Sequence, residues 1–498
     1  MQNSTETRVS VPEDAQRSPG LGDTWAKVRV LAICAGLCSS IAFVIIGVAA
    51  GLQMYGDGSM FSYAIATRGS WAFHWHNISV RLFSYLYSCL PAEAYVAWTG
   101  DPQGGITVYG LLHFSAPLLG LIGTFLLDRS RGRILLAYAS VSTVSLCPLV
   151  FGFPTEMWVA HSLFWPTLAA CHYARVGYAG SLLVTAAMAA LAFTHEGALI
   201  LIVCILGTLT LRGLSNPLLI RALGAFAVAL TLVVLVRFLF PPDDYFAPVL
   251  TRAALKVFDP VLLTNRVLLL ILASLSGYAA MSFLLWLHRP WDAHVWAGLV
   301  VIGILVFYWN LTDPNVLAQN RYYLRTVVII GTPLIGVLAA WYALSAGGEL
   351  KGRLESAENL TKLLARSVPP RVIVGALGIL VLVHSVETVR FVSAWYEYRA
   401  AVRTLATGSD SDITLGDVQF VSTTRIEDGR LKQLAWRSTT PYLSVLLAPN
   451  FSPARLVVDP NTAYFWLSCA TAKENYAADR FFPKASRRLI QAYACLHR

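Results

Sequence analysis

Long uninterrupted apolar runs constrain this chain more than any other feature of its sequence. The first run covers residues 28–52, and similar runs recur as far as residue 387. A helix of about 20 apolar residues crosses the hydrocarbon core of a bilayer, because a helix satisfies its backbone hydrogen bonds internally. Charged residues make up 13% of the chain, about half of their share in an ordinary soluble domain. The sequence therefore predicts a polytopic α-helical membrane protein.

Spans of roughly 17–25 residues predict about eleven transmembrane helices. They lie near residues 28–52, 106–127, 134–153, 156–173, 179–194, 196–211, 220–240, 264–287, 294–309, 326–345 and 371–387. The first run is too long for the core of a signal peptide, so we expect it to remain as the first span. The predicted organisation is a tail (1–27), a transmembrane domain (28–387) with a long first loop (53–105), and a C-terminal domain (388–498).

The distribution of Lys and Arg predicts the orientation of these spans. Basic residues near helix ends resist translocation, so they gather in cytoplasmic loops. With the N-terminus in the cytoplasm, the cytoplasmic connections contain Arg129, Arg131, Arg133, Arg175, Arg212, Arg221, Arg289, Lys351, Arg353, Lys362, Arg366 and Arg371. Basic residues near 252–266, Arg321 and Arg325 run against this bias. We expect a multi-pass protein of the inner or plasma membrane whose C-terminus lies outside.

The net charge of +10 does not indicate a nucleic-acid partner, because the basic residues are spread over short loops and form no basic stripe. The aromatic-rich loop 53–105 predicts helices that lie in the membrane interface. After residue 388 short apolar runs alternate with turn residues, which predicts a small α/β domain outside the membrane. We expect Cys469 and Cys495 to form a disulfide there.

Asp57 follows the first span directly, between Gly56 and Gly58. The two glycines allow a sharp turn and leave the carboxylate accessible, as a general base requires. The alternative is that Asp57 only caps a helix that begins near Met60.

Further candidate residues fall on the same outer side. Glu156 opens the fourth span, where it either serves the site or only complements the helix dipole. His195 and Glu196 join two spans of about 33 residues in total, so each pass averages roughly 25 Å against a core of about 30 Å. A turn below the surface makes ionisable groups costly unless they face a cavity, although a covering loop could also satisfy His195 structurally. These residues predict a single outer active site.

Arg321 and Tyr322 precede the tenth span. Arg321 could hold a phosphate through two hydrogen bonds, or could only direct its charge toward the membrane surface. The sequence has no phosphate-binding glycine loop and no metal-ligand spacing. We interpret Asp410-Ser411-Asp412 as loop composition. We therefore predict no cofactor and no metal site, with the use of a divalent metal left open.

This pattern resembles the GT-C superfamily of membrane glycosyltransferases. The resemblance rests on Asp57 after the first span, on Glu156, His195 and Glu196 in later outer loops, on Arg321-Tyr322 before a late span, and on an outer C-terminal region. It implies an inverting glycosyltransferase with a polyprenyl-phosphate sugar donor and a lipid or glycan acceptor. Asp57 would then be the base, and Arg321 would contact the donor phosphate. Gly58 and Gln319-Asn320 depart from the acidic or His residues that many relatives have at these positions.

The main alternative is a transporter or flippase of a lipid-linked or anionic substrate. Such a protein needs essential ionisable residues on both sides of the membrane. The polar residues assigned to the cytoplasmic side are mostly isolated arginines of the kind that set topology. The sequence therefore favours the enzyme.

Overall fold

A computed structural model describes residues 19–69, 81–146, 155–241, 316–350 and 370–459, with short gaps at 416–417 and 437–438, and the isolated Ser276. The spans predicted near 264–287 and 294–309 lie outside the described residues. Cys469 and Cys495, and with them the predicted disulfide, lie outside them too.

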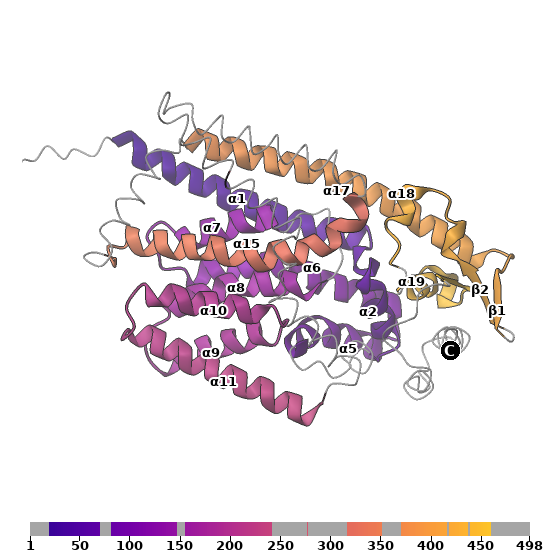
Figure 1. Ribbon diagram of the computed structural model, residues 1–498, viewed down its shortest axis with the longest axis horizontal. Coiled ribbons are helices and arrows are strands. Elements are labelled where there is room, and N and C mark those ends of the chain that lie inside the picture. The colour runs from indigo at the N-terminus through magenta and orange to yellow at the C-terminus, as the bar shows by residue number, and fades with distance from the viewer. Residues whose placement is uncertain are drawn as a thin grey trace, which may run out of the picture.

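Long helices run side by side along the longest dimension of the molecule (Figure 1). They are α1 (Pro19–Ala49), α6 (Pro102–Leu127), α7 (Ile134–Leu146), α8 (Glu156–Tyr173), α9 (Tyr178–Ala192), α10 (Ala198–Thr210), α11 (Pro217–Leu239), α15 (Val316–Ala346) and α17 (Pro370–Thr407). Every predicted span that falls on described residues coincides with one of these helices. In the described part of the chain, five helices are long and apolar enough to cross a membrane: Thr24–Ala49, Pro102–Leu127, Pro217–Leu239, Val328–Ala346 and Leu377–Thr407. The chain is thus a helical membrane protein, as its composition predicts.

Helix α8 lies at the centre of the bundle, and nearly all of its side chains are buried. Trp158, Phe164 and Trp165 fill the space around it. Helix α6 approaches α8 closely at Gly120, where a Cβ atom would lie 2.5 Å from the Ser162 carbonyl oxygen. Small residues allow such close packing between membrane helices. The contact fixes the position of α8, whose first residue is Glu156.

The loop predicted at 53–105 folds into short helices at one end of the bundle. They are the 3₁₀ turn η1 (Leu52–Met54), α2 (Asp57–Ala66), α4 (Leu82–Ser84), the π-helical turn η3 (Tyr85–Cys89) and α5 (Leu90–Thr99). Helix α5 exposes Leu90 and Trp98, in keeping with an interfacial helix. Helix α2 differs from that expectation, because its residues after Asp57 are all buried. The C-terminal region covers α2 and removes it from the surface.

The C-terminal region begins as a continuation of α17, which passes residue 388 without a break. Beyond it lie strands β1 (Ile413–Leu415), β2 (Val418–Ser422) and β3 (Leu456–Val458), and short helices η7 (Thr423–Arg425), α18 (Gly429–Lys432), α19 (Thr440–Leu447) and η8 (Pro449–Phe451). The sheet has the order β1-β2-β3, with β1 antiparallel and β3 parallel to β2. Helix α19 packs between α2 and β3. We call this end of the molecule the sheet end.

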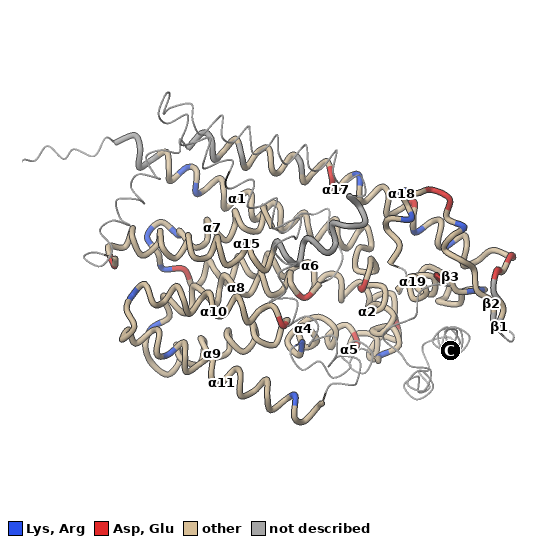
Figure 2. Tube along the Cα trace, viewed as in Figure 1, with Lys and Arg blue, Asp and Glu red and all other residues tan. Residues whose placement is uncertain are grey.

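Charged segments gather at the two ends of the bundle (Figure 2). Red segments lie mostly toward the sheet end. Blue segments mark loops at the end far from the sheet, but they also lie among the red ones toward the sheet end, on α17 and in the C-terminal region.

Candidate functional site

Arg81 lies at the centre of a cluster of charged side chains at the sheet end. Its Nη1 atom is 3.1 Å from Oε1 of Glu156, and its Nη2 atom is 3.6 Å from Oε1 of Glu196. The side chains of Arg81 and Glu156 are 14% and 5% exposed. Arg81 therefore joins the loop before α4, the start of α8 and the turn between α9 and α10.

Backbone contacts place Arg81 beside the turn that contains Glu196. The Phe83 N–H donates to the Phe193 carbonyl over 2.9 Å, and the Ser84 hydroxyl donates to the Thr194 carbonyl over 3.4 Å. Arg81 itself lies just before α4. Phe83 and Ser84, which follow Arg81 closely in the chain, thus attach the loop to the α9–α10 turn. These bonds keep the Arg81 guanidinium near Glu196.

Glu156 is the first residue of α8, and Thr155 precedes it in extended backbone. An acidic residue in the first turn interacts favourably with the helix dipole. Glu156 also accepts a hydrogen bond from Arg81. Glu156 therefore lies at the start of a helix, where it complements the helix dipole, and it also forms part of the charged cluster.

His195 and Glu196 occupy the turn between α9 and α10. The Gly197 N–H donates to His195 Nδ1 over 3.0 Å, and the same Nδ1 lies 3.2 Å from Oε2 of Glu196. One nitrogen cannot accept the first hydrogen bond and donate the second. A neutral ring accepts from Gly197, whereas a protonated ring donates to Glu196. The turn can hold His195 in either protonation state.

Asp57 is the first residue of α2, and Gly56 is its N-cap. The helix begins at Asp57 itself, earlier than the start expected near Met60, so Asp57 lies in the first turn, where an acidic side chain complements the helix dipole. Gly56 has φ +59° and ψ −130°, a conformation that favours glycine. The negative charge of Asp57 acts on Arg81 together with the charges of Glu156 and Glu196. All three predicted carboxylates thus contribute to one electrostatic cluster.

Burial and charge oppose one another in this cluster. Burial alone would lower the pKa of Arg81, but Glu156, Glu196 and Asp57 outweigh it and raise the pKa. Burial alone would raise the pKa of Glu196, but Arg81 and His195 outweigh it and hold the pKa below its ordinary value. Arg81 and Glu196 therefore remain ionised at neutral pH. The described cluster thus combines three carboxyl groups with one guanidinium.

Arg321 and Tyr322 lie in the first turns of α15, and their side chains are outside the described part of the chain. Gly197 packs against Ile329 of the same helix, since a Cβ atom there would lie 3.1 Å from Ile329 Cδ1. Helix α15 therefore packs against the turn that contains His195 and Glu196.

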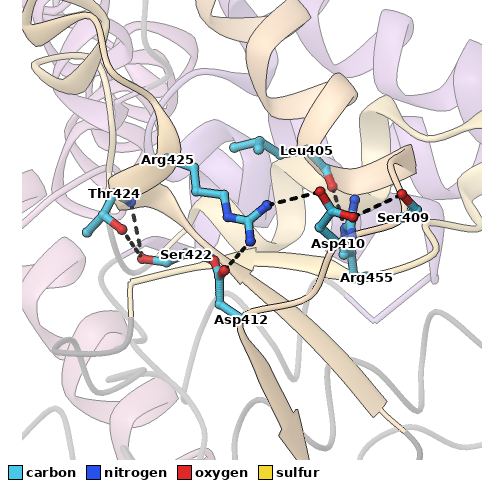
Figure 3. A network of polar contacts seen from close by, with 8 residues as sticks. All are labelled: Leu405, Ser409, Asp410, Asp412, Ser422, Thr424, Arg425 and Arg455. Carbon is cyan, nitrogen blue, oxygen red and sulfur yellow. Dashed lines mark hydrogen bonds and ion pairs between the residues drawn. The ribbon is translucent and has the colours of Figure 1, made fainter.

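The Asp410-Ser411-Asp412 segment serves the C-terminal sheet (Figure 3). Asp412 accepts a hydrogen bond from the Ser422 N–H over 2.8 Å and pairs with Arg425. Asp410 lies 3.8 Å from the same guanidinium. Both carboxylates thus hold an arginine of η7. Among the described residues, no group of three His, Cys, Asp or Glu side chains is arranged to bind a metal ion.

Arg81 is the member of the cluster that the sequence analysis did not identify. A signal for it exists, because Arg68 and Arg81 are the basic residues of the 53–105 loop. Basic residues are disfavoured on the side of the membrane to which this loop was assigned. A basic residue in such a loop is a candidate partner for acidic residues on that side.

The chain matches no protein-family model and no curated protein. The resemblance to GT-C glycosyltransferases therefore stays an expectation from sequence.

Proposed function

We propose that this protein is an inverting membrane glycosyltransferase. It transfers a sugar from a polyprenyl-phosphate donor to a lipid, glycan or protein acceptor on the outer side of the membrane. The observation that carries the proposal is the convergence of Asp57, Glu156 and Glu196 on Arg81 at the sheet end of the bundle. The cluster combines carboxylates with a fixed cation, and sugar transfer from a phosphate requires both.

In the proposed reaction Asp57 takes the proton of an acceptor hydroxyl. The acceptor oxygen attacks the anomeric carbon, and the bond from that carbon to the phosphate oxygen breaks with inversion. Polyprenyl phosphate leaves with the bonding electron pair, and the proton remains on Asp57 until water removes it. Arg81 and Arg321 are the candidate cations for the phosphate.

Asp57 suits the role of base better than its two neighbours do. Glu156 is 5% exposed and hydrogen-bonded to Arg81, and the pKa of Glu196 is lowered. A carboxylate with a lowered pKa is a weaker base. Asp57 is the first residue of α2 and is partly exposed, so an acceptor hydroxyl can reach it.

The first prediction concerns Asp57→Asn. The substitution retains the size of the side chain and costs about 0.3–1 kcal/mol of interaction with the helix dipole, but Asn accepts no proton. We expect transfer to slow by about 10²–10⁴-fold, the usual contribution of a general base. A deletion strain complemented with each variant allows the measurement, through mass spectrometry of donor lipids and envelope glycans.

Asp101→Asn is the matched control, because Asp101 is an exposed carboxylate directly before α6 in the same loop. It should transfer sugar at the wild-type rate. Wild-type glycans in the Asp57→Asn strain would remove Asp57 from the mechanism and leave Glu156 or Glu196 as the base. A deletion strain with unchanged lipids and glycans would overturn the proposed function itself.

A transporter or flippase is the second candidate, and one observation favours it. A second ionic cluster lies at the end of the bundle opposite to the sheet, where Arg212 pairs with Glu349. The Nε atom of Arg212 also donates to His172 Nδ1 over 3.3 Å, and His172 Nε2 lies 3.0 Å from the Thr208 hydroxyl. Charged clusters at both ends are what a gated path requires.

Arg212→Gln separates the two candidates. A glycosyltransferase with its site at the sheet end should retain its transfer rate per folded molecule in this variant. A transporter should lose transport, because one of its two gates is broken. Arg175→Gln is the control, since Arg175 is an exposed arginine at the same end.

A further inference from the structure

The C-terminal end of α1 is capped by side chains from a distant helix. The last carbonyl groups of a helix have no partner within it. Trp395 Nε1 and Arg399 Nη1 donate to the Ala50 carbonyl over 3.0 and 2.9 Å, and the Tyr396 hydroxyl donates to the Ala49 carbonyl over 3.3 Å. These donors lie in α17, about 345 residues further along the chain. The guanidinium also complements the negative end of the α1 dipole.

The same part of α17 holds the segment that leaves α1. The chain turns at Gly51, where φ is +67°, and enters η1. The ring of Tyr55 then packs edge-on against Trp395 and Phe391, with centroid distances of 5.3 and 5.0 Å. The Arg399 guanidinium lies 5.8 Å from the Trp395 ring centroid. Helix α17 therefore fixes the backbone on the N-terminal side of Asp57.

The segment before α19 holds the backbone on both sides of Asp57. A Cβ atom at Gly56 would lie 3.0 Å from the Trp436 indole, so the indole packs directly on the Gly56 backbone. The Ser59 hydroxyl donates to the Thr439 carbonyl over 3.0 Å, and both residues are buried. The turn that contains Asp57 is thus held before and after the carboxylate by residues of the C-terminal region.

We infer that Trp395, Arg399 and Trp436 are positioning residues for the Asp57 carboxylate. Trp436 packs on the backbone directly before Asp57, whereas Trp395 and Arg399 hold the end of α1 from which the chain runs to Asp57. Together they would fix where that carboxylate lies relative to Arg81. The inference rests on the proposed function, in which Asp57 takes a proton from the acceptor. A displacement of about 1 Å at a reacting group can cost about 10²-fold in rate. The C-terminal region is then a part of the active site.

Arg399→Ala tests this inference through kinetics. We expect kcat to fall by about 10²-fold, with a much smaller change in KM for the donor, because the site still binds substrate. Arg399→Lys keeps one donor for the Ala50 carbonyl and should recover part of kcat. Arg403→Ala is the matched control, since Arg403 lies one turn further along α17 and is exposed. It should show wild-type kcat and KM.

Trp395→Phe is a second variant, needed in case Arg399→Ala fails to fold. It keeps an aromatic ring against Tyr55 and removes one hydrogen bond to the Ala50 carbonyl. We expect a smaller decrease in kcat per folded molecule, with a decrease in melting temperature because Trp395 is fully buried. Wild-type kcat in both Trp395→Phe and Arg399→Ala would overturn the inference.

A measurement that does not depend on enzymatic activity separates this inference from the proposed function. Asp57→Cys introduces a thiol at the turn, and its labelling rate with a membrane-impermeant maleimide reports how firmly the turn is held. Labelling should accelerate several-fold when Arg399→Ala is added and stay unchanged when Arg403→Ala is added. Equal rates in all three would overturn the inference. Faster labelling together with a fully active Asp57→Asn would show that the contacts hold the turn but have no role in catalysis, which also overturns it.

Discussion

Single residues decide how the charged cluster is stabilised. Arg81 and Glu156 are separated by 75 residues in the sequence, and both side chains are largely removed from solvent. Removal of one partner from a buried ion pair leaves the other charge without compensation, which costs more than the loss of the whole pair. The pairing can therefore be tested by comparing the free energies of unfolding of variants that lack one partner or both.

The second prediction is that Arg81→Ala destabilises the protein by about 3–5 kcal/mol, the usual cost of breaking a buried pair. Glu156→Gln in the same background should recover part of this loss, because the uncompensated carboxylate is then neutral. Equilibrium unfolding in mixed micelles gives the coupling energy from the four members of the cycle. A coupling energy near zero would contradict the pairing.

The third prediction is a pH dependence at Glu196. Its pKa is lower in the folded protein than in the unfolded chain, where it is about 4.3. The stabilisation is thus complete above the unfolded value and is lost as the pH falls through the lower, folded value. Below about pH 4.3, the melting temperature of the wild type should decrease more steeply than that of Glu196→Gln. Parallel curves for the two proteins would exclude this contribution.

The predicted topology assigned Asp57, Glu156 and Glu196 to one side of the membrane, and in the structure their charges act together on Arg81. Arg81 could not be added by that argument. Its place depends on the hydrogen bond between Phe83 and Phe193, which joins two loops that are distant in the sequence. Such contacts arise from packing and leave no periodic signal.

At the scale of elements, α17 shows what hydropathy misses. Its apolar stretch ends near residue 388, yet the helix continues to Thr407. The continuation has a buried stripe with helical spacing: Phe391, Ala394, Trp395, Tyr398, Val402 and Ala406. This period was present in the sequence, but the charged residues between its members lower the mean hydropathy. The helical spacing of the apolar residues, considered separately from their mean hydropathy, predicts that the helix continues.

The fourth prediction concerns the turn between α6 and α7. Asp128 is fully buried and accepts hydrogen bonds from the Ser130 and Leu136 N–H groups over 2.8 and 3.0 Å. Asp128→Ala leaves two buried donors without partners, at about 1–3 kcal/mol each. We expect a large loss of stability in unfolding experiments, with Asp128→Asn intermediate. The transfer rate per folded molecule should not change, because the turn lies at the end opposite to the cluster; a lower rate would link the two ends.

At the scale of the whole molecule, the basic loops at the end far from the sheet predict the orientation of the bundle. The N-terminus and the turn between α6 and α7 should face the cytoplasm, and the C-terminal sheet should face outward.

The fifth prediction is therefore that reporter fusions after Arg131 and after Ser409 report opposite sides of the membrane. Activity-based reporters of each compartment, such as alkaline phosphatase outside and a fluorescent protein inside, provide the measurement. The same side for both fusions would invalidate the site at the sheet end, because the proposed convergence of outer loops depends on this topology.

Helix α17 also sets a physical limit on what can reach the cluster. Its 38 residues correspond to about 57 Å of helix, against a hydrocarbon core of about 30 Å. No proline follows Pro370 within it, and its glycines, Gly375 and Gly378, lie near its start. The part that extends beyond a core of this thickness contains no helix-breaking residue, so it should be stiff. Because this part carries the region that packs on α2, we expect a substrate to reach the cluster from the side of the bundle.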